Sequence, residues 1–230
     1  MLHKSRGIAL SFVKYRESSI ITRIYTEAFG LQSYIIHGIR SKKSRQKMAR
    51  YQSRSLRDMV IYHKDNGKIH RISEARAAYP FRELPFDMRK SGIALFLTEV
   101  LNKTLKEEVE NKPLFDFLYN SIVVLDQLHQ GVENFHLRFL LQLPLYLGFA
   151  PESAATLFEE THQGVHDQSL AREEKALIGQ LMESNYLSPV QMSQAMRQEI
   201  IETLLRFYRS HVESFGEVKS YPVLQTVMRG

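Results

Sequence analysis

Short alternating runs of apolar and polar residues fill the first 80 positions of the chain, a pattern typical of β-strands with one buried face. In the run GIALSFVKY, Ile8, Leu10 and Phe12 recur at a period of two and are expected to share one face of a strand. Similar runs at residues 20–26 and 31–37 predict a second and a third strand, joined by a tight turn at EAFG.

A β-hairpin is predicted in the run DMVIYHKDNGKIHRISEA, where Asn66 and Gly67 separate two alternating stretches. This pair favours a two-residue type I′ turn, so the fourth and fifth strands are expected to be antiparallel neighbours. Five short strands in some 75 residues suit a small barrel of the oligonucleotide-binding (OB) fold or the SH3-like fold. The long segment between the third and fourth strands favours the OB fold, and we expect that segment to form a flexible loop.

From Pro80 onward the apolar residues recur at the spacing of helices. Asn134 is expected to cap one helix at its N-terminus, and Pro144 to kink or end it. A capping box at Ser188 is expected to open the last helix, which ends near His211. The predicted helices cover residues 81–108, 113–128, 134–149 and 188–211.

The predicted fold class is therefore α+β, with a five-stranded OB-fold barrel followed by an all-helical part. We place the barrel domain at residues 1–79 and the helical domain at 80–230. Within the helical domain, residues 151–186 are polar and are predicted to be an irregular excursion with weak helix content.

Charge is segregated along the chain. Residues 1–80 contain 17 Lys or Arg and 5 Asp or Glu, a balance of +12, whereas residues 81–230 carry −6. Within residues 38–57, eight of 20 side chains are Lys or Arg and none is acidic. Such an unbalanced segment predicts contact with a polyanion, because a surface shaped only for solubility mixes its signs.

Motifs for catalysis and metal binding are missing from the sequence. It has no phosphate-binding glycine loop, no nucleophile elbow, no zinc-protease motif and no cysteine, so we predict neither enzymatic activity nor a cofactor. His162 and His166 have the i, i+4 spacing of a helical metal pair, but a solvated polar loop is the better interpretation. His129 and His136 are expected to be cap or surface residues.

Binding is the remaining class of function. Each cation of the basic segment can neutralise a phosphate, and tyrosines can stack on bases, although packing at the barrel edge is an equally good explanation for each ring. The predicted phosphate-binding residues are Arg40, Lys42, Lys43, Arg45, Lys47, Arg50, Arg54 and Arg57, with Arg16 and Arg23 extending the track across the barrel. The predicted base-stacking residues are Tyr25, Tyr34 and Tyr51. Arg138, Arg197 and Arg206 are surface candidates for docking a protein.

The order of these features resembles the RecO family of bacterial recombination mediators over nearly the whole chain. The residues that carry the resemblance are Gly7, Glu17, Thr26 and Gly30, the basic run after Gly38, Glu74, Phe207-Tyr208 and Phe215-Gly216. Many relatives have a four-cysteine zinc motif in the helical domain. This chain departs from them there, which puts a structural zinc in doubt.

The resemblance implies binding of single- and double-stranded DNA and annealing of complementary strands. It also implies partnership with RecR and with the C-terminal tail of single-stranded-DNA-binding protein (SSB) in loading RecA, as in the RecFOR pathway. No short motif locates the SSB contact in this chain. The residues themselves leave two other classes open, an RNA-binding OB protein and an interaction scaffold with a basic loop. No membrane span or cleavable signal is predicted, and a cytoplasmic location is expected.

Overall fold

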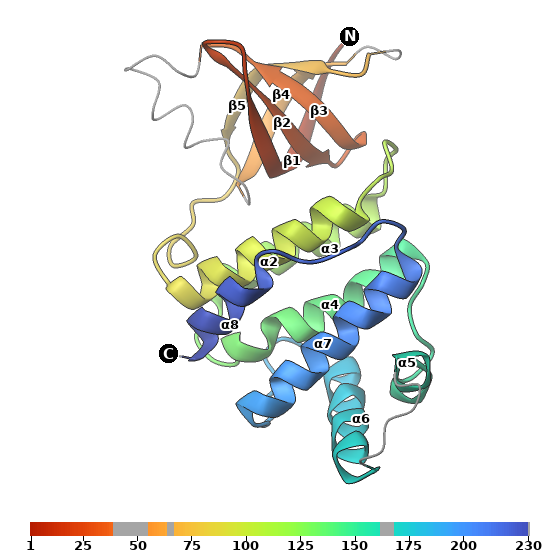
Figure 1. Cartoon of the computed structure of the whole chain (residues 1–230). Coiled ribbons are helices and arrows are strands. Elements are labelled where there is room, and N and C mark those ends of the chain that lie inside the picture. Colours follow the sequence, from red (N-terminus) through yellow and green to blue (C-terminus); the bar gives the residue numbers. More distant parts are fainter. Residues whose placement is uncertain (39–54, 64–66, 162–167, 230) are drawn as a thin grey trace.

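The computed structural model describes residues 1–38, 55–63, 67–161 and 168–229. An N-terminal β-barrel lies against helices α2 and α3, while α5 and α6 lie farthest from it (Figure 1). The predicted α+β fold class is confirmed.

Five strands form the barrel. They are β1 (Leu2–Tyr15), β2 (Ser19–Thr26), β3 (Gly30–Ile36), β4 (Leu56–Tyr62) and β5 (His70–Ala77). Their order around the closed barrel is β1, β2, β3, β5, β4, in which β3 and β5 are parallel and every other pair is antiparallel. This is the OB arrangement. The predicted antiparallel pairing of β4 and β5 is confirmed, whereas the two-residue turn involves Asn66, which lies outside the described residues.

A β-bulge in β1 corrects one prediction. Its register shifts between Ala9 and Ser11, so Leu10 is an extra residue and the strand changes face there. Ile8 and Leu10 therefore belong to the apolar cluster shared with the helices, while Phe12 packs inside the barrel beside Ile20. The expectation that Ile8, Leu10 and Phe12 share one face was wrong, because a simple period of two holds only in a strand without a bulge.

The helical part contains all four predicted helices, the fourth with a later start, and adds three more. The α-helices are α2 (Met88–Thr104), α3 (Lys112–Gln127), α4 (Phe135–Leu147), α5 (Ala154–Thr161), α6 (Gln168–Glu183), α7 (Gln194–His211) and α8 (Tyr221–Arg229), with a 3₁₀ turn, η2 (Val132–Asn134), before α4. Their buried faces join in one apolar cluster.

Three predictions about the later helices were wrong. The supposed excursion contains α5 and α6, whose Leu157, Ile178 and Leu181 are buried in the common core. Helix α7 starts later than expected, because Ser193 rather than Ser188 accepts the capping hydrogen bond from the Met196 backbone N–H, at 3.0 Å. It is also followed by α8, so it is not the last helix.

Helix α4 begins directly after its predicted N-cap residue, Asn134, but the bonding of that residue and the effect of Pro144 differ from the prediction. Asn134 makes no side-chain cap, and instead its amide nitrogen donates to the Val190 carbonyl at 2.7 Å. Pro144 lies within α4 without ending it. Because proline has no N–H, the Leu140 carbonyl lacks its usual helical donor, and the buried Tyr208 hydroxyl donates to that oxygen at 2.9 Å.

The barrel and the helices meet through apolar packing with ion pairs at its edge. Ile8 and Tyr25 lie in the same buried cluster as α2 and α3. Beside them, Arg6 Nη2 lies 2.8 Å from Glu27 Oε1 and 3.1 Å from Asp116 Oδ1 on α3. The barrel is thus held in one orientation, which fixes the surfaces that remain exposed.

Candidate nucleic-acid interface

Most of the predicted phosphate-binding residues lie outside the described residues. These are Arg40, Lys42, Lys43, Arg45, Lys47, Arg50 and Arg54, together with the predicted base-stacking residue Tyr51. Their role stays a prediction from the sequence. The structure does describe the strands on either side of their segment: β3 ends at Ile36, and β4 begins at Leu56.

Arg16 lies at the end of the barrel where β3 leads into that segment. It occupies the exposed turn between β1 and β2 with a φ of +50°, and its guanidinium is 5.2 Å from the centre of the Tyr15 ring. Ser19, just after the turn, shares a 3.0 Å hydrogen bond with His37, just after β3. The structure therefore places Arg16 beside the start of the basic segment, as the predicted track requires.

Arg23 and Arg57 are placed differently. The half-buried Arg23 points toward α2, where its Nη1 donates to Asn102 Oδ1 at 3.4 Å. Arg57 is only 6% exposed, in a row with Gly7 and Ala77. A guanidinium in this position is not accessible to a phosphate, so burial speaks against Arg57 as a binding residue.

Two predicted base-stacking rings are buried. Tyr25 is 2% exposed and stacks on Phe115 of α3 with 6.4 Å between ring centroids, and burial raises the pKa of its hydroxyl to about 12. Tyr34 has no exposed surface and packs inside the barrel with Ile24 and Met59. Neither ring can reach a base without unpacking a core, so the packing explanation holds for both.

The outer surface of β1, β4 and β5, which we call the β1–β4–β5 face, presents exposed and half-exposed residues that the sequence analysis missed. Cross-strand pairing arranges them in rows. Running toward the helices, the rows are Leu2, Tyr62 and Arg71; Lys4, Val60 and Glu74; and Arg6, Asp58 and Arg76. The prediction began β1 at Gly7 rather than Leu2, so it left out the strand that completes this face.

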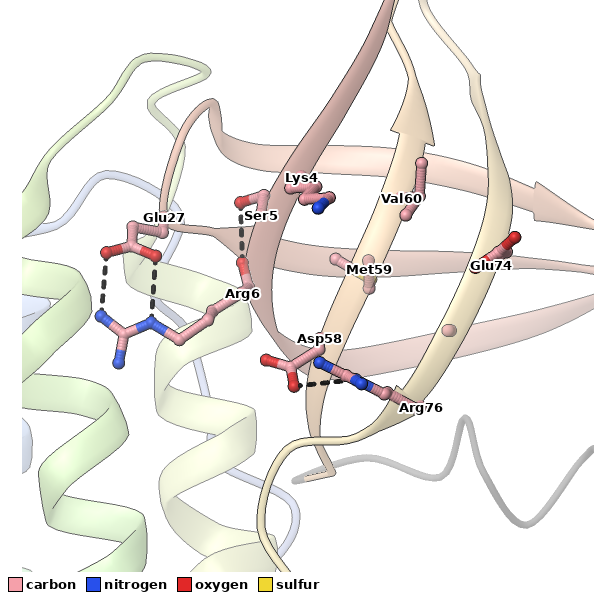
Figure 2. Close-up of a pocket in the computed structure, with 10 residues that line it drawn as sticks. Lys4, Ser5, Arg6, Glu27, Asp58, Met59, Val60, Glu74 and Arg76 are labelled. Carbon is pink, nitrogen blue, oxygen red and sulfur yellow. Dashed lines mark hydrogen bonds and ion pairs between the residues drawn. The ribbon is translucent and has the colours of Figure 1, made fainter.

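The second and third rows border an open groove of about 530 Å³ (Figure 2). Its charges balance, because three cations and three carboxylates line it: Lys4, Arg6, Arg76, Glu27, Asp58 and Glu74. Arg76 Nε lies 3.2 Å from Asp58 Oδ2, and Arg6 pairs with Glu27. The groove by itself is therefore not a phosphate track, whereas the first row carries positive charge and an exposed ring.

Hydrogen bonds from cationic side chains stabilise the ionised carboxylates on the helix side of this groove. The hydrogen bond from Arg6 lowers the pKa of the Glu27 carboxyl. For Asp116 the hydrogen bond from Lys112 lowers the carboxyl pKa, and Arg6 adds to the effect. Both carboxylates are ionised at neutral pH, so Arg6 serves the junction between barrel and helices rather than a ligand.

Metal and docking predictions had mixed outcomes. Among the described residues no three His, Asp or Glu side chains are placed to hold a metal ion, while His162 and His166 lie outside those residues. His129 is exposed, as expected, but His136 is only 2% exposed, so that prediction was wrong. Arg138 is fully buried, and its Nε donates to Ser184 Oγ at 3.0 Å, which removes it from any docking surface.

Arg197 and Arg206, the other two docking candidates, are both partly buried. Arg197 Nε donates to Asn134 Oδ1 at 2.9 Å, and Arg206 Nη2 donates to the Thr203 hydroxyl at the same distance. These contacts are within the helical part. Within the described part of the chain, every helix is too short or too polar to span a membrane.

Comparison with known proteins places both halves of the chain in one family. Residues 1–81 match the family described as Recombination protein O N terminal, and residues 85–222 match Recombination protein O C terminal. Among curated relatives, proteins named DNA repair protein RecO from Bacteroides fragilis and Phocaeicola vulgatus are 34% and 35% identical, each covering 98% of both chains. The protein of that name from Flavobacterium johnsoniae is 32% identical over 97% of this chain and 98% of its own.

Proposed function

The chain belongs to the RecO family of DNA repair proteins, and on that premise we propose that it is a non-enzymatic recombination mediator that anneals complementary DNA strands. In this proposal it binds single- and double-stranded DNA in the cytoplasm. It acts with RecR and with the SSB tail to load RecA onto SSB-coated DNA.

One observation carries the proposal, a closed OB barrel with a strongly basic segment inserted between β3 and β4. OB barrels are a common scaffold for oligonucleotides because the barrel is rigid while its loops vary. Here the insertion brings seven cations between residues 39 and 54 without a single carboxylate. Arg16, exposed where β3 ends, adds an eighth at the same end of the barrel.

The physics of annealing matches this layout of charge. Two complementary strands repel each other through their phosphates, and a polycation beside a rigid barrel can screen both strands together. Each neutralised phosphate releases condensed counterions, so affinity falls steeply with salt and does not depend on sequence. Catalysis would consist of bringing strands together, with no covalent step.

The test is annealing of two complementary oligonucleotides, bare and then coated with SSB, across a salt series. The parent protein is compared with a variant in which Lys42, Lys43, Arg45, Lys47 and Arg50 are replaced by glutamine. We expect the parent to anneal both substrates, with activity falling as salt rises. For the variant we expect DNA binding to weaken for all sequences alike and its salt slope to flatten by about 3.5, because each phosphate that a cation neutralises on a single strand adds about 0.7 to the slope.

Three outcomes would count against the proposal. A variant that binds and anneals like the parent removes the basic segment from the site. Binding without annealing, with RNA preferred over matched DNA, favours an RNA-binding role. No salt-sensitive binding of either nucleic acid by the parent favours a protein-interaction scaffold.

A further inference from the structure

We propose that the far end of the β1–β4–β5 face is a second binding surface for single-stranded nucleic acid, separate from the basic segment. The surface consists of Tyr62 and Arg71 in the first row, Lys4 in the second row and Lys68 in the β4–β5 connection, and we call it the Tyr62 patch. In it the Tyr62 ring stacks on a base while the three cations contact phosphates. The inference rests on the proposed function and adds a surface to it.

Exposure distinguishes Tyr62 from the tyrosines of the barrel core. Its side chain is the last of β4 and is 45% exposed, whereas Tyr25 and Tyr34 are 2% and 0% exposed. Its row neighbour on β1, Leu2, is 59% exposed. A flat ring at the end of a strand, flanked by an apolar side chain, is the kind of platform on which bases stack in single-strand binders.

Among the described residues, the charged side chains in the row of Tyr62 and in the β4–β5 connection, Arg71 and Lys68, are both cationic. Lys4, Lys68 and Arg71 are exposed, and within the part of the chain that the structure describes none of them forms an ion pair. The carboxylates of the face lie in the second and third rows, and one of them, Asp58, is paired with Arg76, as Figure 2 shows. Arg71 in the first row and Lys68 in the connection therefore offer positive charge with no ion pair among the described residues, and Lys4 borders them from the second row, where it also lines the groove.

The position of the patch suits a nucleic-acid ligand. Tyr62 and Arg71 lie opposite each other at the start of the β4–β5 connection, one of the loops with which OB folds bind oligonucleotides. From Arg71 the same outer row continues through Ile35 and Ile21 to Val13, which is 61% exposed. Strand β1 ends next to Arg16. One row of exposed and half-exposed side chains therefore runs from the Tyr62 patch to the turn that carries Arg16.

A protein with two such surfaces has a specific advantage in annealing. The basic segment screens phosphates of any strand, but screening alone does not hold a strand with its bases presented. A ring and cations on rigid strands can hold one strand while the other pairs with it. A protein partner would find a better match in the charge-balanced groove, so the observations favour nucleic acid at the patch.

The experiment measures binding of a fluorescent oligothymidylate by anisotropy over a salt series. The variants are Tyr62→Leu, Tyr62→Phe, Arg71→Gln and the double variant Lys4→Gln/Arg71→Gln. The matched control is Arg76→Gln, which removes one exposed arginine from the same face of the same strand. The variant with the five glutamines in the basic segment is measured in parallel.

We expect Tyr62→Leu to bind about fivefold more weakly or worse, which corresponds to the loss of one stacked base, and Tyr62→Phe to bind like the parent. Arg71→Gln should flatten the salt slope by about 0.7 and the double variant by about 1.4. Arg76→Gln should leave both affinity and slope near the parent values, since its guanidinium is already paired with Asp58.

A direct test uses the same oligothymidylate with 5-iodouracil, photocrosslinked to the parent and mapped by mass spectrometry. We expect a crosslink at Tyr62. If Tyr62→Leu and the double variant bind like the parent and no crosslink maps to β4, the patch is not a binding surface. That result overturns this inference alone when the basic-segment variant still loses binding, whereas a parent that binds no nucleic acid overturns the proposed function as well.

Discussion

His136 shows how a single buried ring can set the pH dependence of the whole fold. It is 2% exposed in α4, with its ring edge against Phe96 at 6.3 Å between centroids. Burial, helped by the positive charge of Arg197, lowers the pKa of its imidazole to about 3. The unfolded chain therefore takes up this proton near pH 6.5, well before the folded chain does.

We predict that this histidine makes the protein less stable in mild acid. Its folded pKa lies below its unfolded pKa, so the stability present above pH 6.5 is lost as the pH falls toward 3. Between pH 7 and pH 5 the loss should be about 2 kcal/mol in the free energy of unfolding. Urea unfolding of the parent and of His136→Gln at both pH values measures the difference.

The exposed His129 provides the control for this prediction. His129→Gln should lose as much stability between pH 7 and pH 5 as the parent, whereas His136→Gln should lose about 2 kcal/mol less. The comparison uses the change with pH and not the absolute stability, because replacing a buried ring also alters packing. Equal pH dependence in the parent and in His136→Gln would show that His136 is not buried in its neutral form.

Residue-level predictions from the sequence failed wherever burial decided the outcome. Tyr25, Tyr34 and Arg57 have the right chemistry for nucleic acid, but all three are buried. Period-two alternation separates the two faces of a strand without saying which outer face another domain covers. Arg16 is exposed, because a turn between two adjacent strands lies at the surface, and its contact with nucleic acid stays a prediction.

At the level of elements, the connection from the barrel to α2 is held by one carboxylate. Asp126, near the end of α3, accepts hydrogen bonds from the backbone N–H groups of Arg82, Glu83 and Leu84, the shortest being 2.7 Å. It also accepts one from the Tyr79 hydroxyl at 3.1 Å. Burial alone would raise the pKa of this carboxyl, but the donated hydrogen bonds outweigh it and lower the pKa.

We predict that Asp126→Ala destabilises the protein by about 3 kcal/mol, because it leaves several buried backbone donors without an acceptor. The connection should also open, so that trypsin cleaves after Arg82 faster than in the parent. Urea unfolding and limited proteolysis measure the two effects. Gln127→Ala, next to it, removes only an exposed hydrogen bond to the Tyr79 hydroxyl at 3.2 Å and leaves Asp126 with its backbone donors, so it should change stability by less than about 1 kcal/mol. A parent-like cleavage rate in Asp126→Ala would contradict this function of the carboxylate.

The predicted elements show which signals are local. The barrel could be predicted because each turn and each strand pattern depends on a few consecutive residues. Helix α6 was missed because it is polar overall and packs on the common core through few apolar residues, among them Ile178 and Leu181. The start of α7 was misplaced because Ser188 and Ser193 both suit a cap, and only packing decides which of them serves.

At the scale of the whole molecule, the barrel and the helices share an apolar core and backbone hydrogen bonds in addition to the connecting segment. Ile8, Leu10 and Tyr25 belong to the apolar cluster that runs through the helices. On the other side of the junction, the backbone N–H of Leu31 donates to the Glu107 carbonyl at 3.0 Å, in the connection after α2. The division at residue 79 therefore remains a prediction, and the contacts across it predict cooperative unfolding of the two parts.

Gly30 tests this cooperativity, because it lies where β3 starts against the α2–α3 connection. Its φ is +61°, and a Cβ built on it would lie 2.3 Å from the Val109 carbonyl oxygen. Gly38, just beyond the other end of β3, also has a positive φ, +71°, but a Cβ there meets no atom of the described residues within 4 Å. An alanine at either glycine would strain the backbone, but only at Gly30 would its Cβ also clash with the α2–α3 connection.

We predict that Gly30→Ala and Gly38→Ala each destabilise the protein by about 1–2 kcal/mol through the backbone conformation. Only Gly30→Ala should also separate the barrel from the helices, since backbone atoms cannot move aside as a flexible side chain can. Hydrogen exchange measures this, and in the parent and Gly38→Ala the amides of β2 and of α2 should open with similar free energies. In Gly30→Ala those of β2 should open at lower free energy than those of α2. If both strands and helices in Gly30→Ala lose protection equally, the contact at Gly30 contributes to stability without coupling the two parts, and the apolar cluster alone holds them together.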